Sequence, residues 1–209
     1  MRWFGIDSGG ANLKLADGSG FAESLSFALW KQPRRLAQEL RTLIAHAPVC
    51  DHLAVPMTGE LADCFATKSE GVRSILEALV EASDGRHTRV YLVNGMLVTP
   101  GVAKTRPSEV AAANWHALAR FAGRFAPHAT ALLIDVGSTT CDVIPISNGE
   151  PVAHATSDTE RLICGELVYT GVERSPVCAV LDSAPFRGRP CPLAHELFAS
   201  MRDVYVILN

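Results

Sequence analysis

The stretches Gly5-Ile6-Asp7-Ser8-Gly9-Gly10-Ala11-Asn12 and Asp135-Val136-Gly137-Ser138-Thr139-Thr140-Cys141-Asp142 carry the pattern from which the fold of this chain can be inferred. In each stretch an apolar segment leads to an aspartate, and a glycine follows that aspartate two positions later. Strand-forming residues also come after each stretch, so both predict a glycine loop that joins two neighbouring strands. Because the same order occurs twice, the sequence predicts an internal duplication of architecture.

Strand patterns and helix patterns alternate along the rest of the chain. Predicted strands cover residues 2–7, 13–16, 21–29, 52–55, 90–93, 131–135 and 142–146, with a further candidate at 152–156. Predicted helices run from Pro33 to Pro48, from Thr67 to Asp84, from about Ser108 to Phe125 and from Leu193 to Leu208, and a connector rich in Pro and Gly covers 100–107. The apolar run at 131–135 predicts a buried strand. The alternation of strands and helices indicates an α/β fold.

The duplication also predicts how the chain divides into domains. We expect two similar lobes, with a boundary in the third predicted helix or just after it, near residue 127. Residues 1–127 then form a first lobe with a helical insertion, and residues 128–209 form the beginning of a second lobe.

Composition and charge exclude several classes of function. The chain has 209 residues, of which 48% are hydrophobic and 20% are charged, and its net charge is −3. Because this balance gives no strongly basic surface, we do not expect the protein to bind nucleic acid. No apolar stretch has the length of a membrane span or the form of a leader, so we expect a cytoplasmic protein without membrane contacts. Nothing in the sequence specifies an oligomeric state.

Cysteine and histidine usage gives no sign of a metal centre or of disulfides. The 6 cysteines include no Cys-x-x-Cys pair, and the 7 histidines are scattered along the chain. We therefore predict reduced thiols and no zinc site.

The two glycine loops contain the groups that bind a phosphate. Glycine can adopt a positive φ and lets backbone N–H groups approach an anion closely, and the hydroxyls of Ser138, Thr139 and Thr140 add donors. An aspartate can hold a hydrated Mg²⁺ that bridges to phosphate oxygens. Two ordinary hairpin turns, with Asp and Gly as turn formers, are the alternative. We predict that phosphate is bound by Asp7, Ser8, Gly9, Gly10, Asn12, Gly137, Ser138, Thr139 and Thr140, and Mg²⁺ by Asp7 and Asp135.

This pair of loops resembles those of the actin-like ATPase superfamily, in which two such loops face each other across a cleft and clamp phosphates. Five ordered motifs make the resemblance more specific, and they lie at residues 5–12, 57–65, 112–115, 135–142 and 158–171. Together they are similar to the hydantoinase A-like (hydantoinase/oxoprolinase) family, in its branch of proteins linked to tetrahydromethanopterin-dependent C1 transfer. The resemblance implies an actin-like, ribonuclease H-like α/β fold with duplicated lobes.

The resemblance also implies a reaction, because archaeal members of the family make an aryl ether in methanofuran biosynthesis. An aminomethylfuran-methanol diphosphate donates its furanylmethyl group to the phenol oxygen of a tyramine or tyrosine derivative, and diphosphate leaves. Backbone N–H groups and Mg²⁺ would stabilise the departing diphosphate, and the phenol, whose pKa is about 10, needs a nearby base. Two alternatives are an ATP-dependent kinase or hydantoinase/oxoprolinase-type hydrolase, and a non-catalytic fragment or scaffold.

Further residues in the shared motifs are candidates for the site. Glu60 and Asp63 are candidate general bases, with helix capping or a solvated loop as the alternative. Residues predicted to line the cleft are Asn114, Asp142, Arg161, Gly165 and Glu166. Asn114 could equally occupy a core position with a satisfied amide, and the stretch around Arg161 could be a helix N-terminus with salt bridges. In the connector, Lys104 and Arg106 could contact diphosphate, although a charged linker is the simpler interpretation.

The stretch Val204-Tyr205-Val206-Ile207-Leu208 is a run of five apolar residues near the end of the sequence. Members of the family continue beyond this point, so we expect an incomplete second lobe. An apolar helix face without a later packing partner would expose on the order of a few hundred Å², and each Å² left unburied forgoes about 25 cal/mol.

We therefore predict that the 209-residue chain self-associates or is only marginally stable, and that it shows no acceptor turnover. Light scattering and thermal melting of the purified protein measure the first two properties. A monodisperse monomer with a high, cooperative melting temperature and full transferase activity would contradict the prediction.

Overall fold

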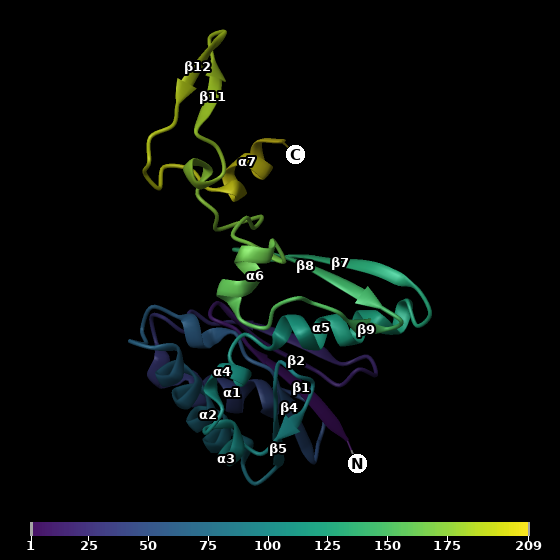
Figure 1. Cartoon of the computed structure of the whole chain (residues 1–209). Coiled ribbons are helices and arrows are strands. Elements are labelled where there is room, and N and C mark those ends of the chain that lie inside the picture. The colour runs from purple at the N-terminus through teal and green to yellow at the C-terminus, as the bar shows by residue number, and fades with distance from the viewer. Residues whose placement is uncertain (1, 209) are drawn as a thin grey trace. The chain divides into compact units, whose positions relative to one another are not determined.

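Two units make up the computed structural model, which describes residues 2–208 (Figure 1). The first unit is Met1–Phe121 and the second is Ala122–Asn209. Both combine helices with β-sheet, and in the first unit strands and helices alternate along the chain, which confirms the predicted α/β class. None of the helices in the described residues is long and apolar enough to cross a membrane.

A six-stranded sheet forms the centre of the first unit. Its strands are β1 (Trp3–Ser8), β2 (Asn12–Ala16), β3 (Ala22–Ser26), β4 (His52–Val55), β5 (His87–Tyr91) and β6 (Leu97–Val98), in the spatial order β3-β2-β1-β4-β5-β6. The first three strands form an antiparallel meander, whereas β4 runs parallel to β1 and β5 runs parallel to β4. The step from β4 to β5 passes through α2 (Lys68–Ser83), because parallel neighbours require a crossover connection.

Helices α1 (Leu36–His46) and α2 pack against one face of this sheet (Figure 1). Both helices carry the apolar stripe that their sequence predicts, with Leu40 and Leu43 buried on α1 and Ile75 and Leu76 buried on α2. The strands contribute Phe4, Ile6, Leu13, Leu15, Leu53, Val55 and Val90 to the same core. Because side chains alternate along a strand, the residues between these core positions face away from α1 and α2.

Both ends of α2 follow signals in the sequence. The Thr67 hydroxyl oxygen accepts a hydrogen bond from the N–H of Glu70 at 3.1 Å, and the N–H of Ala66 donates to the Glu70 carboxylate at 3.2 Å. This exchange closely resembles a capping box. The helix ends at Asp84, which adopts a left-handed conformation with a φ of 49°.

The region after β5 differs from the prediction. The predicted connector at 100–107 contains a short helix, and the single helix predicted from Ser108 to Phe125 is interrupted. The elements are α3 (Pro100–Ala103), α4 (Pro107–Val110), α5 (Asn114–Ala122) and the 3-10 helix η3 (Gly123–Phe125). The interruption includes Ala112, whose φ is 49°. Apolar periodicity does not reveal this break, because alanine is a good helix former and gives no turn signal.

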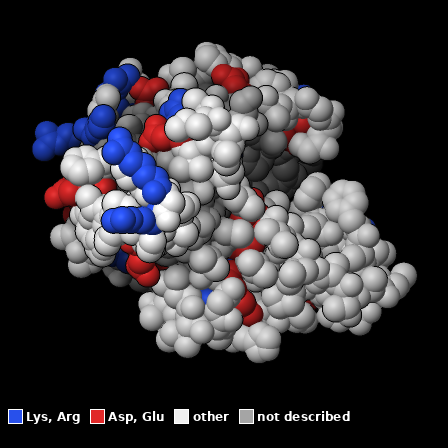
Figure 2. Space-filling view, turned by 90° about the horizontal axis from the view of Figure 1, so that it is seen from above, with Lys and Arg blue, Asp and Glu red and all other residues white. Residues whose placement is uncertain are grey.

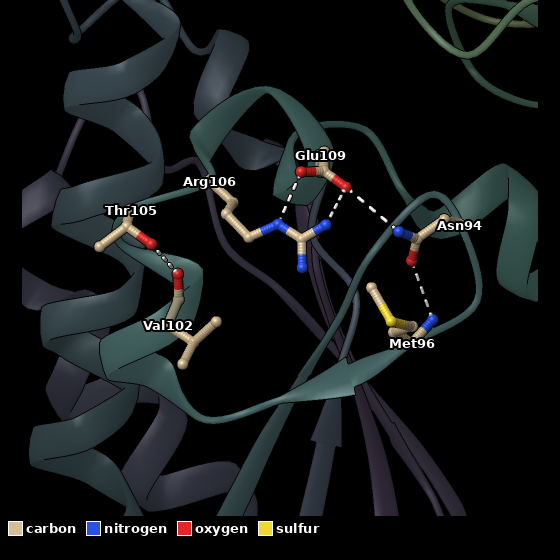
Figure 3. Close-up of polar contacts among 6 residues, drawn as sticks. All are labelled: Asn94, Met96, Val102, Thr105, Arg106 and Glu109. Carbon is tan, nitrogen blue, oxygen red and sulfur yellow. Dashed lines mark hydrogen bonds and ion pairs between the residues drawn. The ribbon is translucent and has the colours of Figure 1, made fainter.

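Side-chain hydrogen bonds stabilise the segment between β5 and α4. Arg106 donates to the carboxylate of Glu109 through Nε at 2.6 Å and Nη2 at 2.5 Å, and Asn94 Nδ2 donates to the same carboxylate at 3.1 Å (Figure 3). Lys104 Nζ lies 3.2 Å from a carboxylate oxygen of Glu77. Both cations of the connector therefore have acidic partners within the first unit, which favours the charged-linker interpretation.

The second unit is built on the hairpin of β7 (Thr130–Val136) and β8 (Cys141–Ser147). Its other elements are β9 (Glu150–Pro151), α6 (Asp158–Cys164), β10 (Leu167–Val168), η4 (Val177–Ala179), the separate hairpin of β11 (Ser183–Phe186) and β12 (Arg189–Pro192), and α7 (Met201–Leu208). β9 and β10 both pair with β8. All strand pairs among the described residues of this unit are antiparallel, so the parallel strands β4 and β5 have no counterpart here.

Two predicted elements of the second unit differ in the structure. The strand predicted at 152–156 is not formed, and the described strand next to it is the two-residue β9, which pairs with β8. The helix predicted from Leu193 begins only at α7. The N–H and the hydroxyl of Ser200 both donate to the carboxylate of Asp203, at 2.7 and 2.9 Å, and mark that start.

Burial differs between the two units. The apolar core described above consists of residues between Phe4 and Ala111. In the second unit the buried hydrophobic residues are Ile144, Ile146, Ala155 and Leu167. The prediction that residues 131–135 form a buried strand is wrong, because Leu132 and Ile134 are 58% and 59% exposed. An apolar run shows that a strand can be covered on both faces, but other elements of the fold decide whether it is.

A glycine of α2 gives a test of the packing in the first unit. A Cβ on Gly71 would lie 2.3 Å from the carbonyl oxygen of Glu60, which belongs to the 3-10 helix η2 (Gly59–Leu61). We predict that Gly71→Ala destabilises the chain by about 1–3 kcal/mol, because backbone atoms must move to admit the methyl group. Urea unfolding measures the change.

Gly101 in α3 is the matched control, since a Cβ there would meet no atom within 4 Å. Gly101→Ala should be neutral or should stabilise the chain by up to about 1 kcal/mol, because alanine is the better helix former. Equal free energies of unfolding for the two variants would contradict the close contact between α2 and η2.

Candidate functional site

The first glycine loop is a tight hairpin between β1 and β2. The N–H of Gly9 donates to the carbonyl of Asn12 at 3.1 Å, which leaves Gly10 and Ala11 at the tip. A Cβ on Gly9 would lie only 3.0 Å from that same carbonyl oxygen. Glycine therefore allows this close approach of the backbone, which a larger residue would have to widen by a few tenths of an ångström.

The second glycine loop closes in the same way between β7 and β8. The N–H of Gly137 donates to the carbonyl of Thr140 at 2.8 Å, with Ser138 and Thr139 at the tip. A Cβ on Gly137 would lie 3.2 Å from the Thr140 oxygen. The strand–loop–strand order predicted for both stretches is confirmed.

The loop glycines do not use the positive φ that glycine allows. Gly9, Gly10 and Gly137 are absent from the described residues with positive φ. Both loops nevertheless present backbone donors, since a peptide N–H without a partner in the chain can bind an external acceptor. Within the described residues, no hydrogen bond uses the backbone N–H groups of Gly10, Ala11, Ser138, Thr139 and Thr140.

The two aspartates have different neighbours across their hairpins. Asp7 pairs in register with Lys14, and Asp7 Oδ2 lies 3.5 Å from Lys14 Nζ. Asp135 instead pairs in register with Asp142. Because directly opposed side chains interact, the first aspartate has a cation beside it and the second has another carboxylate.

The donor chemistry at both aspartates fits the predicted magnesium ion. Mg²⁺ prefers oxygen ligands, and proteins commonly hold it through one or two carboxylates together with phosphate oxygens and water. The described residues contain no group of three His, Cys, Asp or Glu side chains placed to hold a metal. A Mg²⁺ ion at Asp7 or Asp135 would therefore take its remaining ligands from phosphate and water.

Three residues predicted to line a cleft form one network in the second unit. Arg161, on α6, is 1% exposed and donates to Asp142 Oδ1 at 2.8 Å and to the carbonyl oxygen of Glu166 at 3.0 Å. The Glu166 carboxylate accepts the N–H of His154 at 2.7 Å. Burial raises the pKa of Asp142, the Arg161 guanidinium opposes that shift, and the charge of Asp135 adds to it. The network connects β8, α6 and the residue before β10.

Capping residues at both ends of α6 explain the positions of Gly165 and Ser157. Gly165 ends α6 with a φ of 74°, and the N–H of Glu166 donates back to the carbonyl of Arg161 at 2.9 Å. At the other end the Ser157 hydroxyl oxygen accepts the N–H of Glu160 at 3.3 Å. The helix-terminus interpretation of this stretch is confirmed, and Gly165 acts in it as a C-cap.

The remaining predicted residues lie in contrasting environments. Ser8 is 1% exposed and shares the core-facing side of β1, so its hydroxyl points away from solvent. Glu60 is also 1% exposed, whereas Asp63 is exposed. Asn12 begins β2, and Asn114 is the half-buried first residue of α5 rather than a position in the middle of a helix.

A hollow of about 490 Å³ lies beside Asp7 on the sheet of the first unit. Its floor includes Gly5, Ala16 and Ala22, which the strand register places side by side on β1, β2 and β3. Lys14 also lines it. The sheet is accessible down to its backbone here because these floor residues have at most one side-chain carbon.

On the face shown in Figure 2 the basic side chains gather at the upper left, with acidic side chains among them. Large areas of that face carry neither sign.

Comparison with known protein families identifies the chain. The family model described as hydantoinase/oxoprolinase matches residues 51–209, which is most of the sequence. The chain belongs to the hydantoinase/oxoprolinase family. The resemblance inferred from the five ordered motifs is thus confirmed.

Two curated relatives of this hydantoinase/oxoprolinase protein carry the same synthase name. Over 208 residues it is 38% identical to a protein of Methanocaldococcus jannaschii named (4-{4-[2-(gamma-L-glutamylamino)ethyl]phenoxymethyl}furan-2-yl)methanamine synthase, a match that covers 98% of this chain and 61% of that protein. A protein of Methanococcus vannielii with the same name is 36% identical over 78 residues, which are 37% of this chain and 35% of that protein. The chain thus spans about three fifths of the length of the first of these relatives.

A solved structure was also found to be similar to the chain. The crystal structure of an exopolyphosphatase-like protein is 15% identical, with a TM-score of 0.39. The match covers 72% of this chain and 48% of that one.

Lys14, Gly171 and Ser175 are not among the residues predicted for the site. The sequence could have revealed Lys14. The hairpin loop is closed by Gly9 and Asn12, and Asp7 lies two residues before Gly9 while Lys14 lies two residues after Asn12, so the two face each other across the hairpin. Gly171 stands in the fifth motif, but no local pattern shows that it packs on the second glycine loop.

The raised pKa of Asp142 predicts a pH dependence of stability. The folded chain binds the Asp142 proton more tightly than the unfolded chain does. Its contribution to stability is therefore fully present below the unfolded pKa, about 4, and is lost as pH rises through the raised folded pKa. We predict that Asp142→Asn, which does not titrate, gains stability relative to the original chain as pH rises from about 4 to about 7.

Urea unfolding of both proteins at several pH values measures this difference. A difference in the free energy of unfolding that stays constant, or that moves in favour of the original chain as pH rises, would contradict the prediction.

Proposed function

We propose that this chain carries the diphosphate-binding part of a methanofuran-type synthase, which transfers an aminomethylfuran-methyl group from its diphosphate to a phenol oxygen. The observation that carries the proposal is the identity of 38%, over 98% of the chain, to a synthase named for a phenoxymethylfuran product. The ether in that name joins a phenol oxygen to a furanylmethyl carbon.

In this transfer the furanylmethyl carbon exchanges one C–O bond for another. The bond to diphosphate breaks, and its electron pair leaves with the diphosphate. The phenol oxygen forms the new bond and gives its proton to a base. Negative charge grows on the leaving diphosphate, so fixed N–H donors aimed at it accelerate the reaction.

Backbone groups of each glycine loop would bind phosphate oxygens. The N–H groups of Gly10 and Ala11 in the first loop, and of the residues from Ser138 to Thr140 in the second, are donors of the required kind. The hydroxyls of Ser138, Thr139 and Thr140 add to them. When bound, Mg²⁺ held by Asp7 or by Asp135 would supply positive charge for the leaving group.

Among the candidate bases, the exposed Asp63 is more accessible to a bound phenol than Glu60, which is 1% exposed. Lys14, 3.5 Å from Asp7, would add a further positive charge beside the first loop. A carboxylate base and a cation beside the leaving group have complementary tasks, because one accepts the phenol proton and the other stabilises the diphosphate.

The fold supports a more specific assignment. We propose that residues 1–127 and 128–209 are two lobes of an actin-like, ribonuclease H-like fold, because β1-β2-β3 and β7-β8-β9 repeat one order of strand, glycine loop, strand, turn and strand.

We also propose that the protein is cytoplasmic. All six cysteines are free thiols, which supports this location.

A charge-removing variant tests the proposed role of the aspartates in holding Mg²⁺. We predict that Asp135→Asn weakens the Mg²⁺-dependent binding of diphosphate by about tenfold or more, because a carboxylate ligand to the ion is lost. Titration calorimetry with magnesium pyrophosphate measures the affinity.

Asp84→Asn is the control for the same chemical change. Asp84 caps α2 in a left-handed conformation that asparagine also adopts readily, so this variant should bind like the original chain. Equal affinity of Asp135→Asn and the original chain would remove Asp135 from the proposed site.

A comparison of ligands tests the proposed substrate class. The chain should bind the aminomethylfuran-methyl diphosphate more tightly than ATP in the presence of Mg²⁺. Tighter binding of ATP would favour an ATP-dependent kinase or hydrolase, and binding of neither ligand would favour a non-catalytic role. Calorimetry of both ligands with one protein preparation distinguishes these results.

A further inference from the structure

The segment Gly171–Ser175, which we call the strap, lies along the second glycine loop. Its backbone N–H groups donate to the carbonyl oxygens of Gly137 and Ser138 over distances between 2.7 and 3.2 Å. The hydroxyl of Ser175 donates to the carbonyl oxygen of Thr139 at 3.3 Å. Three consecutive carbonyl groups of the loop are therefore directed at the strap.

This arrangement decides where the N–H groups of the loop point. In a trans peptide the C=O and the following N–H point in opposite directions, and the described chain contains no cis peptide. The N–H groups of Ser138, Thr139 and Thr140 follow the three bound carbonyls, so they point away from the strap. A peptide that flipped would replace an N–H donor with a carbonyl oxygen, which repels an anion.

Two residues of the strap make this close contact possible. A Cβ on Gly171 would lie 2.5 Å from both Ser138 C and Thr139 N, so a larger residue would separate the strap from the loop. Ser175 Oγ accepts the N–H of Gly171 at 2.8 Å, and its own proton is thereby directed to the Thr139 carbonyl. Gly171 and Ser175 are buried, whereas the three residues between them are exposed. The strap is thus anchored at its two ends.

The first glycine loop has an equivalent arrangement with a different anchor. The N–H of Phe27 donates to the carbonyl of Ala11 at 2.9 Å, and that of Leu29 donates to Gly10 at 3.0 Å. The side chains of Phe27 and Leu29 are buried in the apolar core of the first unit. Burial thus fixes the orientation of the first loop, whereas the second depends on the two ends of the strap.

The outer edge of the strap is bound by the start of α7. The N–H of Met201 donates to the carbonyl of Ser175 at 2.8 Å, and the N–H of Arg202 donates to the carbonyl of Glu173 at 3.3 Å. With partners on both edges, the strap is held as a ribbon between the loop and the helix.

We propose that Gly171 and Ser175 are positioning residues, which orient the loop Gly137–Thr140 so that its three N–H donors face a phosphate or diphosphate oxyanion. This inference rests on the proposed function, because it assigns the orientation of a loop that the proposed function places at the diphosphate. Neither residue touches the anion. Both act on it through the peptide groups of the loop.

The experiment uses the full 209-residue chain, labelled with ¹⁵N, and magnesium pyrophosphate as the probe. Calorimetry measures affinity, and amide NMR shifts report on each loop separately. We expect Ser175→Ala to weaken binding by about tenfold, the effect of one lost hydrogen bond, and Gly171→Ala to weaken it further. In both variants the amide shifts of Ser138, Thr139 and Thr140 on titration should shrink, while those of Gly10 and Ala11 persist.

Ser183→Ala makes the same chemical change at an exposed position of β11 and should bind like the original chain. Because Gly171→Ala can fail to fold, Ser175→Ala with an unchanged melting temperature is the decisive variant. Unchanged affinity and unchanged shifts in Ser175→Ala would overturn the role of the strap and leave the proposed function intact. Failure of the original chain to bind pyrophosphate would overturn the proposed function and, with it, the role of the strap.

Discussion

One backbone hydrogen bond that closes a tight loop, and that occurs in both units, is the constraint on which the rest of this structure depends. It joins the N–H of a glycine to the carbonyl three residues later, from Gly9 to Asn12 and from Gly137 to Thr140. The approach is close enough that a side chain would push the backbone apart, since a Cβ would lie 3.0 or 3.2 Å from the accepting oxygen. The closure also sets the register of each hairpin, and the register decides which side chain lies opposite each aspartate.

The two units stabilise their loops by different physical means. The first unit buries a continuous apolar core beneath the antiparallel meander and the two helices. The second unit buries few apolar residues and relies on polar contacts, above all on Arg161, which bonds to Asp142 and to the Glu166 carbonyl. A buried charge of this kind stabilises a structure only while all of its partners are present, so the second unit is the more sensitive to single polar substitutions.

The proposed phosphate binding by the two loops would be general rather than specific for one ligand. Backbone N–H groups respond to the charge and shape of a phosphate, and they do not distinguish the organic group attached to it. The same donors therefore suit a nucleotide or a furanylmethyl diphosphate. The synthase name of the chain's relatives, rather than the geometry of the loops, directs the proposal to an ether-forming transfer.

The sequence by itself determined the α/β class, both strand–loop–strand units, helices α1 and α2, the caps of α2, and the family. These features depend on local signals, such as apolar periodicity, capping residues and glycine beside aspartate. The sequence did not reveal the break at Ala112 or the exposure of β7, because both depend on packing with distant elements. The tertiary structure alone decided that Arg161 is buried against Asp142 and that Gly171 lies on the second glycine loop. Each of these contacts joins residues that no local pattern relates, so only the folded chain brings them together.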